Sequence, residues 1–227
     1  MYNITQKFIS YNRSHESLSP QGIVLHATDD KGATANNEFN YFNTGNRKAS
    51  AHAFIDWTDI IETIPDNEVA WGSGYTSNHR YLQVELCEPA THDESKFNEV
   101  WNRAVWYFAY KLVNKIKINT VSKDNILSHA EISAKWHETT HNDPIDFFSE
   151  YGKTVDQFRE EVQSMINTIN NVERIVNSMQ IKDVQHVCNV LGIRDYEGKS
   201  LDEDNLNGKR TESSRQKLKE ILTYILR

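Results

Sequence analysis

Apolar residues in the first two thirds of the chain recur in two patterns, one typical of strands and one typical of helices. The short apolar run Gly22–Leu25 predicts a buried strand that ends at His26. Residues Tyr81–Cys87 alternate apolar with polar side chains, which predicts a half-buried strand with Glu85 on its less apolar face. Two further strands are expected over residues 51–57 and 59–64, and helices over residues 33–44 and 93–115. Because strands and helices are interleaved, the pattern predicts a sheet covered by helices.

The pattern changes after Gly152, where the apolar residues have helical spacing only and no further strands are predicted. Thr154 and Gln157 form a capping box, which predicts a helix that continues to about residue 176. The middle of this helix is rich in Asn, and we interpret it as a tether between two folded parts.

Two short helices are predicted beyond the tether, over Ile181–Leu191 and Thr211–Leu226, with a turn-rich stretch between them. Together they form a small helical unit of feasible size. The side chains of the first helix that should face inward are Val184, Val187, Cys188 and Leu191. The expected organisation is a first domain over residues 1–152, a tether over 153–176 and a helical module over 177–227.

Composition and charge narrow the class of protein. The chain has 227 residues, of which 38% are hydrophobic and 11% aromatic, so it can bury a sizeable core and does not resemble a disordered chain. Its net charge of −7 lies entirely in residues 1–152, because residues 153–227 hold 12 basic and 12 acidic side chains. An acidic first domain argues against a nucleic-acid partner.

Targeting and cysteine chemistry exclude further classes. No apolar run approaches the roughly 20 residues of a membrane span, so no membrane partner is expected. The first ten residues lack the apolar core of a secretory signal, which predicts a cytoplasmic location in the producing cell. Cys87 and Cys188 are too few for a disulfide framework or a cysteine-based zinc cluster.

One local motif matches a zinc protease pattern. His137–His141 reads H-E-x-x-H, which binds metal only when both histidines share one face of a helix. Thr139 and Thr140 are poor helix formers, and Pro144 follows closely. We therefore expect no metal-binding helix here, and we keep the zinc protease as an alternative.

A second, dispersed set of residues carries the same chemistry. His26 ends a predicted strand, Glu85 lies on another, and His129 and Asp143 stand 14 residues apart. Two histidines and one carboxylate suffice for a catalytic zinc ion with a position left for water, and a second carboxylate can take a proton from that water. Spacing alone leaves structural roles open, since a histidine at a strand end is often a hydrogen-bonded core residue and Glu85 could be solvated.

Several segments resemble a known family. Residues 28–35 read T-D-x-x-G-A-T-A, residues 49–56 read A-S-A-H-x-F-I-D, LQVELC occupies 82–87, and SHAEIS and THNDP lie within 128–144. In this order they resemble the zinc-dependent N-acetylmuramoyl-L-alanine amidases of phage endolysins and bacterial autolysins. The resemblance implies a mixed α/β sheet flanked by helices, related to that of peptidoglycan recognition proteins. It also implies cleavage of the amide between N-acetylmuramic acid and the L-alanine of the peptidoglycan stem peptide.

The same resemblance assigns expected roles to individual residues. His26, His129 and Asp143 match the zinc ligands, although many relatives have Cys in place of the aspartate. Glu85 matches the carboxylate that activates water. His141 occupies the position where many relatives have a lysine that stabilises the oxyanion, so its contribution is left open.

Two more residues are expected near the substrate. Trp71 lies in a turn-rich stretch and is expected to wall the substrate groove, with a core position as the alternative. His52 is expected at the substrate surface or as a structural histidine of a nearby strand. Residue 51, where some relatives have tyrosine, is alanine.

The C-terminal segment has a weaker resemblance. Residues 181–214 resemble short three-helix peptidoglycan-binding modules, although Asn205 and Cys188 depart from their pattern. A dimerisation or linker unit is the alternative. The sequence therefore predicts a peptidoglycan hydrolase, and the missing signal favours a phage endolysin that lyses a Gram-positive host and acts on the wall after release. A cytoplasmic recycling enzyme is the alternative that the wall-binding tail disfavours, and the choice between a phage enzyme and a bacterial autolysin stays open. An inactive peptidoglycan-binding protein of the same fold is a further alternative, and the sequence leaves the oligomeric state open.

Overall fold

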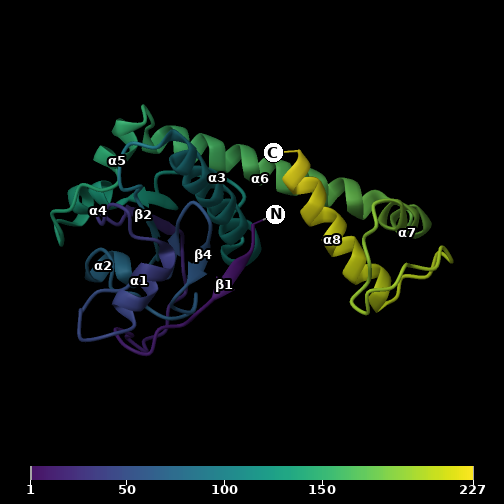
Figure 1. Cartoon of the computed structure of the whole chain (residues 1–227), viewed down its shortest axis with the longest axis horizontal. Helices are drawn as coiled ribbons and strands as arrows, with labels where there is room; N and C mark the ends of the chain where they lie inside the picture. The colour runs from purple at the N-terminus through teal and green to yellow at the C-terminus, as the bar shows by residue number, and fades with distance from the viewer. Residues whose placement is uncertain (1, 227) are drawn as a thin grey trace. The chain divides into compact units, whose positions relative to one another are not determined.

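The computed structural model describes residues 2–226, which divide into two compact units (Figure 1). The first unit comprises residues 2–163 and the second residues 164–226 of this range. The division falls inside the long helix α6, Val155–Ser178. The domain boundaries proposed from the sequence, after residues 152 and 176, stay predictions.

A mixed sheet forms the centre of the first unit. Its strands lie in the order β1-β4-β3-β5-β2-β6, and only β3 and β4 pair antiparallel. The strands are β1 Ile4–Gln6, β2 Ile23–Ala27, β3 Ala53–Ile55, β4 Ile60–Glu62, β5 Leu82–Leu86 and β6 Ile126–Ser128. This arrangement confirms the expected mixed sheet. All four strands predicted from the sequence are present: β3, β4 and β5 are shorter than expected, and β2 ends one residue later, at Ala27.

Helices cover both faces of this sheet. The helices before α6 are α1 Ala35–Phe42, α2 Tyr75–Asn78, α3 Glu94–Lys111, α4 His129–Trp136 and α5 Ile145–Glu150, and the π-helical turn η1 Leu112–Ile116 extends α3. Helix α3 packs against one face, where Tyr107 donates a hydrogen bond to Glu62 (3.2 Å). On the other face, α1 packs on β3 and β4, while α4 packs on β2 and β6. The carboxyl ends of β2 and β5 therefore lie between α1 and α4.

Strand β5 is more buried than the alternation of its apolar and polar residues predicts. Gln83, on the polar side of the pattern, is fully buried, and Glu85 is only partly exposed. The reason is the tertiary structure, because β5 lies between β3 and β2, and the side chain of Gln83 contacts the Ser73 hydroxyl and the His26 ring. Polar side chains on this strand are consequently held inside the protein.

The second unit is helical. The later part of α6 packs with α7, Ile181–Val190, and α8, Lys209–Ile225, around a small apolar core. The buried members of that core are Val172, Val176, Val184, Cys188, Ile193, Leu201 and Leu218. Leu191 was expected to face inward but is 51% exposed, because α7 ends before it and Gly192 turns the chain with a positive φ. Ile193 takes the inward position instead.

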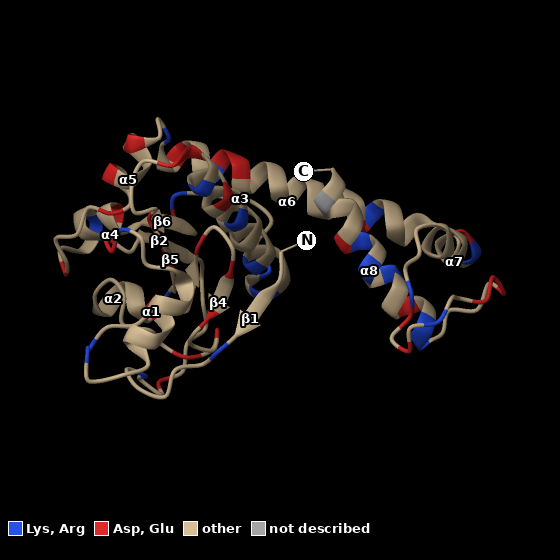
Figure 2. Ribbon diagram, viewed as in Figure 1, with Lys and Arg blue, Asp and Glu red and all other residues tan. Residues whose placement is uncertain are grey.

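Charge is distributed differently among the helices (Figure 2). Acidic side chains gather on α5 and at the start of α6, whereas α8 carries mainly basic ones. Over the described residues, we find no helix with both the length and the apolar character needed to cross a membrane.

Candidate metal centre and active site

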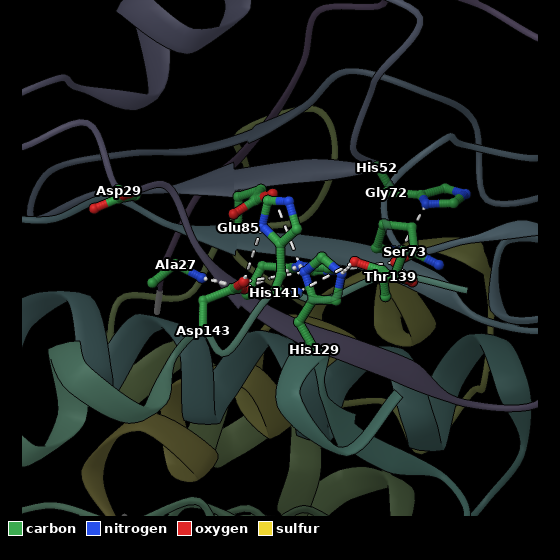
Figure 3. A network of polar contacts seen from close by, with 12 residues as sticks. Ala27, Asp29, His52, Gly72, Ser73, Glu85, His129, Thr139, His141 and Asp143 are labelled. Atoms are coloured by element: carbon green, nitrogen blue, oxygen red, sulfur yellow. Dashed lines mark hydrogen bonds and ion pairs between the residues drawn. The ribbon is translucent and has the colours of Figure 1, made fainter. Parts of the chain in front are cut away.

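Three side chains converge at the carboxyl ends of adjacent parallel strands (Figure 3). His26 is the fourth residue of β2, and His129 begins α4 directly after β6. Asp143 comes from the loop before α5, where its carbonyl accepts a hydrogen bond from the Ala130 amide (3.1 Å). One potential ligand atom of each of the three residues lies within 4.8 Å of the others. The carboxyl end of parallel strands is the usual ligand-binding edge of α/β sheets.

The three ligand atoms face one another closely. Nδ1 of His26 lies 3.0 Å from Nδ1 of His129 and 3.2 Å from Oδ2 of Asp143. Oδ1 of Asp143 lies 3.0 Å from Nδ1 of His129. The two imidazole rings are buried and meet edge to face, with 4.6 Å between their centroids.

Each imidazole uses its other nitrogen for a contact with the protein. Nε2 of His26 lies 2.9 Å from Oε1 of Gln83, and Nε2 of His129 lies 3.1 Å from the hydroxyl of Thr139. An amide oxygen can only accept, so Nε2 of His26 is the protonated nitrogen, and in the neutral ring Nδ1 keeps a free lone pair. Protein groups that hold the far nitrogen of a metal-ligating histidine are typical of metal sites.

The protein's own charges favour a cation among these three residues. Burial works against a charged His26, but the Glu85 and Asp143 carboxylates outweigh it and raise the pKa of His26 to about 9. Burial lowers the pKa of His129 despite its bond to Asp143. Burial also acts to raise the pKa of Asp143, yet the two histidines hold that pKa far below its usual range. A single positive charge is thus stabilised where the three side chains meet.

The donor set fits zinc. Two imidazole nitrogens and one carboxylate oxygen are the ligands of known catalytic zinc sites, and they leave a coordination position for water or substrate. Without a cation or a proton between them, the lone pairs of His26 and His129 would repel the nearby carboxylate oxygens. Among the described residues, this is also the group that satisfies the geometric requirement for a metal site.

Glu85 lies beside this centre. It pairs with His26 across β2 and β5, so both side chains lie on the same face of the sheet, and its Oε1 is 4.0 Å from Nδ1 of His26. Its Oε2 is buried and has no hydrogen-bond partner among the described residues. Burial raises the pKa of Glu85 to about 7, with Asp143 adding to the shift and His26 opposing it. A carboxylate with a free oxygen and a pKa near neutrality is suited to accept a proton from water.

His141 lies at the solvent side of the centre. Its ring stacks on that of His129, with 4.8 Å between centroids, and its Nδ1 is 3.7 Å from Oδ1 of Asp143. Its side chain is 70% exposed. His141 can therefore reach a bound substrate, and its role in stabilising an oxyanion stays a prediction.

Two cavities open next to the three ligands, and both are lined in part by Trp71, His129 and His141. The larger, of about 1090 Å³, extends toward Tyr75 and His79. The smaller, of about 650 Å³, contains His26 and Glu85 together with an acidic rim. Trp71 thus lines the space where a substrate would bind, as expected of it, although contact with substrate stays a prediction.

His52 is placed differently from the expectation that it binds substrate. It is fully buried, its Nε2 donates to the carbonyl of Glu68 (2.8 Å), and its Nδ1 accepts from the amide of Gln83 (2.8 Å). Burial lowers its pKa to about 4, so the ring is neutral. With both nitrogens engaged by main chain, His52 supports β5 and does not reach the cavities, which corrects the substrate-binding assignment.

The H-E-x-x-H segment is not helical. His137 ends α4 with a left-handed backbone, and the segment continues as a loop. The carboxylate of Glu138 accepts hydrogen bonds from the amide and hydroxyl of Thr76 (2.7 and 2.5 Å). The helical geometry that a zinc protease needs is therefore missing from this segment.

Sequence reasoning missed two polar residues that contact the centre, Gln83 and Thr139. Gln83 stands two positions before Glu85 on the same strand, so the strand period alone places both on one face. The spacing of two residues could therefore have identified Gln83 as a neighbour of the site. Thr139 lies within the loop and had no comparable signal, because its contact with His129 depends on the path of the chain.

Comparison with known proteins shows which family the sequence matches. The sequence profile of the N-acetylmuramoyl-L-alanine amidase family matches residues 16–146, which hold all the site residues described above. Protein Ami of Listeria monocytogenes is 31% identical over 159 residues, covering 68% of this chain and 17% of that protein. The bifunctional autolysin of Staphylococcus aureus is 32% identical over 157 residues, covering 67% of this chain and 12% of that protein. The chain thus spans less than a fifth of the length of either curated relative.

Solved structures share the fold. The Staphylococcus aureus hydrolase AmiA, in complex with its ligand, superimposes with a TM-score of 0.64 at 28% identity, over 71% of this chain and 82% of that one. The catalytic domain of XlyA gives a TM-score of 0.58 at 26% identity, over 70% of this chain and 99% of that one. These similarities support the mixed sheet with flanking helices described above.

Proposed function

The chain belongs to the N-acetylmuramoyl-L-alanine amidase family, and we propose that it hydrolyses the amide between N-acetylmuramic acid and the L-alanine of the peptidoglycan stem peptide. One observation carries the proposal. Two imidazole nitrogens and one carboxylate meet at the carboxyl ends of the strands, and the Glu85 carboxylate lies beside them, with its Oε1 4.0 Å from Nδ1 of His26, next to two cavities that reach the surface. These are the groups that hydrolysis of an unactivated amide requires.

We propose that His26, His129 and Asp143 hold a zinc ion. When bound, zinc would supply a Lewis acid for the scissile carbonyl and make water easier to deprotonate. The three side chains are suited to this because Gln83 and Thr139 fix the far nitrogens of the two rings.

Glu85 is the proposed general base. The Glu85 side chain lines the smaller cavity, and its Oε2 has no partner among the described residues, so the carboxylate is available to take a proton from the attacking water. The same carboxyl then donates this proton to the nitrogen of the leaving L-alanine. Burial keeps the site dry enough for the charge of Glu85 to matter, because water screens it poorly there.

His141 and Trp71 complete the proposed site. An N–H of the exposed His141 ring can donate to the carbonyl oxygen as negative charge develops on it. Trp71 borders both cavities and would pack against a substrate bound there.

Digestion of purified cell walls tests the reaction. We expect new L-alanine amino termini and no new reducing sugars, measured by mass spectrometry, and about one zinc per chain by elemental analysis. A chelator should abolish digestion while circular dichroism shows that the fold largely persists, since the sheet has its own apolar core. Full digestion in excess chelator, or reducing ends in place of L-alanine termini, would contradict the proposal.

We also propose that the second unit binds peptidoglycan and thereby raises the concentration of the enzyme at its insoluble substrate. Its support is the resemblance of residues 181–214 to peptidoglycan-binding modules. Sedimentation with insoluble walls should retain the full chain more strongly than residues 1–163, while both cleave soluble muropeptide. Equal retention of the two proteins would contradict the targeting role. That the enzyme is a phage endolysin made in the cytoplasm and acting after release stays a proposal.

A further inference from the structure

The amide of Gln83 is held in a single orientation. Gln83 is fully buried, and its Nε2 donates to the carbonyl of Tyr81 (3.2 Å). Its Oε1 accepts from the hydroxyl of Ser73 (2.7 Å) and lies 2.9 Å from Nε2 of His26. If the amide were turned over, its oxygen would face the carbonyl of Tyr81, and two acceptors would repel each other. The oxygen of Gln83 therefore faces His26.

This orientation determines the proton position on His26. Because Oε1 of Gln83 can only accept, Nε2 of His26 must carry the hydrogen. In the neutral ring, the lone pair then resides on Nδ1, which faces His129 and Asp143. The alternative tautomer would put a hydrogen on Nδ1 and remove this nitrogen from the set of ligands.

The environment holds Gln83 itself in place from several sides. The main-chain amide of Gln83 donates to the His52 ring, and its carbonyl accepts from the His52 amide (2.7 Å). Gly72 lies so close that a Cβ there would come within 2.8 Å of Oε1 of Gln83. The side chain consequently has little freedom to leave His26.

We propose that Gln83 is a positioning residue that selects the Nε2-protonated tautomer of His26 and so prepares Nδ1 to bind the metal. The inference rests on the proposed function insofar as it takes His26 as a metal ligand. Partners of this kind are commonly worth about 10- to 100-fold in metal affinity. It also gives His52 a role, since His52 holds the main chain of Gln83 in register.

Competition for zinc with a fluorescent chelator tests the proposal on the full chain. Gln83→Met keeps the size of the side chain but has no oxygen acceptor, and its dissociation constant for zinc should rise about 10- to 100-fold. In its protonated form, Gln83→Glu retains an acceptor oxygen opposite Nε2 and a donor toward the carbonyl of Tyr81, so we expect affinity within about threefold of wild type.

The matched control is Thr63→Val. Thr63 is as buried as Gln83, and its hydroxyl donates to the carbonyl of Ala51 (2.6 Å) without contacting His26. This variant should lower the melting temperature and leave zinc affinity unchanged. If Gln83→Met binds zinc within about threefold of wild type, Gln83 does not position the ligand and the inference is wrong.

A second measurement requires no variant. In the zinc-loaded wild-type protein, ¹⁵N NMR of the His26 ring should show a slowly exchanging hydrogen on Nε2 and zinc on Nδ1. Ligation through Nε2 would overturn the inference. If the wild type does not bind zinc, both this inference and the proposed zinc site are wrong. If Gln83→Met loses zinc but the wild type does not digest walls, only the proposed amidase activity is wrong.

Discussion

The two units of this protein both bury polar side chains, but they use them differently. In the first unit, His26, Glu85 and Asp143 approach one another at the edge of the sheet, and Glu85 keeps an oxygen without a partner among the described residues. In the second unit, the buried Gln185 and the half-buried Asn189 use both their amide oxygen and their amide nitrogen in hydrogen bonds, although Ser214 Oγ and Arg215 Nε are buried without a hydrogen-bond partner among the described residues. The first arrangement leaves a polar group available for a reaction, and the second uses its polar groups to hold the chain in place.

The contacts of Gln185 illustrate the second case. Its Nε2 donates to Asp204 (2.9 Å), to the carbonyl of Leu206 (3.1 Å) and to Thr211 (3.2 Å). Its Oε1 accepts from the amide of Asn205 (3.1 Å). One buried amide thus fixes the loop between α7 and α8.

The size of the apolar core explains the difference. The sheet of the first unit is packed by helices on both faces, with fully buried side chains such as Phe54, Tyr107 and Phe108. Among the described residues, the second unit has a cluster of seven buried apolar side chains, too few to stabilise a long loop by apolar burial alone. The large core of the first unit tolerates a buried group such as Glu85 that is available for chemistry, whereas the amide of Gln185 in the smaller unit serves structure.

Glu85→Gln provides the largest test of this contrast. Glutamine keeps the size of the side chain but cannot accept a proton, so turnover should fall about a hundred- to ten-thousandfold. Zinc content should be retained and the melting temperature should stay within a few degrees, because Glu85 serves chemistry rather than packing. Wild-type turnover in the zinc-loaded variant would assign the proton transfer to another group, His141 first.

Gln185→Met should have the opposite profile. It leaves the Asn205 amide and the Thr211 hydroxyl without their buried partner, which should destabilise the second unit by about 2–3 kcal/mol. Hydrogen exchange of α7 and α8 measures this, and turnover of soluble muropeptide should not change. The exposed Gln216→Met on α8 is the control, with an expected change below about 0.5 kcal/mol. Equal effects of the two substitutions would refute the structural role of Gln185.

Glu38 in α1 tests whether the larger core of the first unit tolerates a buried carboxyl group that destabilises the fold. It is 6% exposed, its Oε1 has no partner among the described residues, and burial together with Asp30 and Glu85 raises its pKa to about 7. The unfolded chain loses this proton near pH 4.5, so the folded state is penalised increasingly as the pH rises from there to 7. Glu38→Gln should therefore stabilise the first unit by about 1–2 kcal/mol at pH 8 and by little at pH 4.5. Thermal unfolding at both pH values measures this, and a gain that does not depend on pH would show that Glu38 is not charged at pH 8.

Leu191→Ser has the smallest expected effect. Leu191 lies outside the core of the second unit at 51% exposure, so the free energy of unfolding should change by less than about 0.5 kcal/mol. Ile193→Ser, at 5% exposure in the same unit, should cost several times more. Hydrogen exchange of α7 measures the stability of both variants. If Leu191→Ser lowered the free energy of unfolding more than Ile193→Ser, Leu191 would be the inward residue, as the sequence pattern predicts.

Much of the first unit could be predicted because its signals are local. The apolar run before His26 and the alternation around Glu85 placed both residues on strands, where the structure has them. The short elements β6, α4 and α5 were not predicted, so the meeting of His129 with Asp143 followed from the family resemblance alone. Three-residue strands carry too few positions for a period to show.

The sequence by itself determined the local features of this protein: the strand that ends near His26, the capping box of Thr154 and Gln157, and the non-helical path of the H-E-x-x-H segment. Each depends on residues a few positions apart, so local conformational preference is enough to establish it. Only the tertiary structure decided which polar side chains meet.

The contacts that distinguish the site connect distant positions. Gln83 reaches His26 across 57 residues, and His26 reaches His129 across 103. His52 turned out to be a support for Gln83 rather than a substrate contact, because the order of β3 beside β5 brings its ring onto that strand's main chain. Strand order and register are decided by the burial of whole faces, which no short stretch of sequence contains.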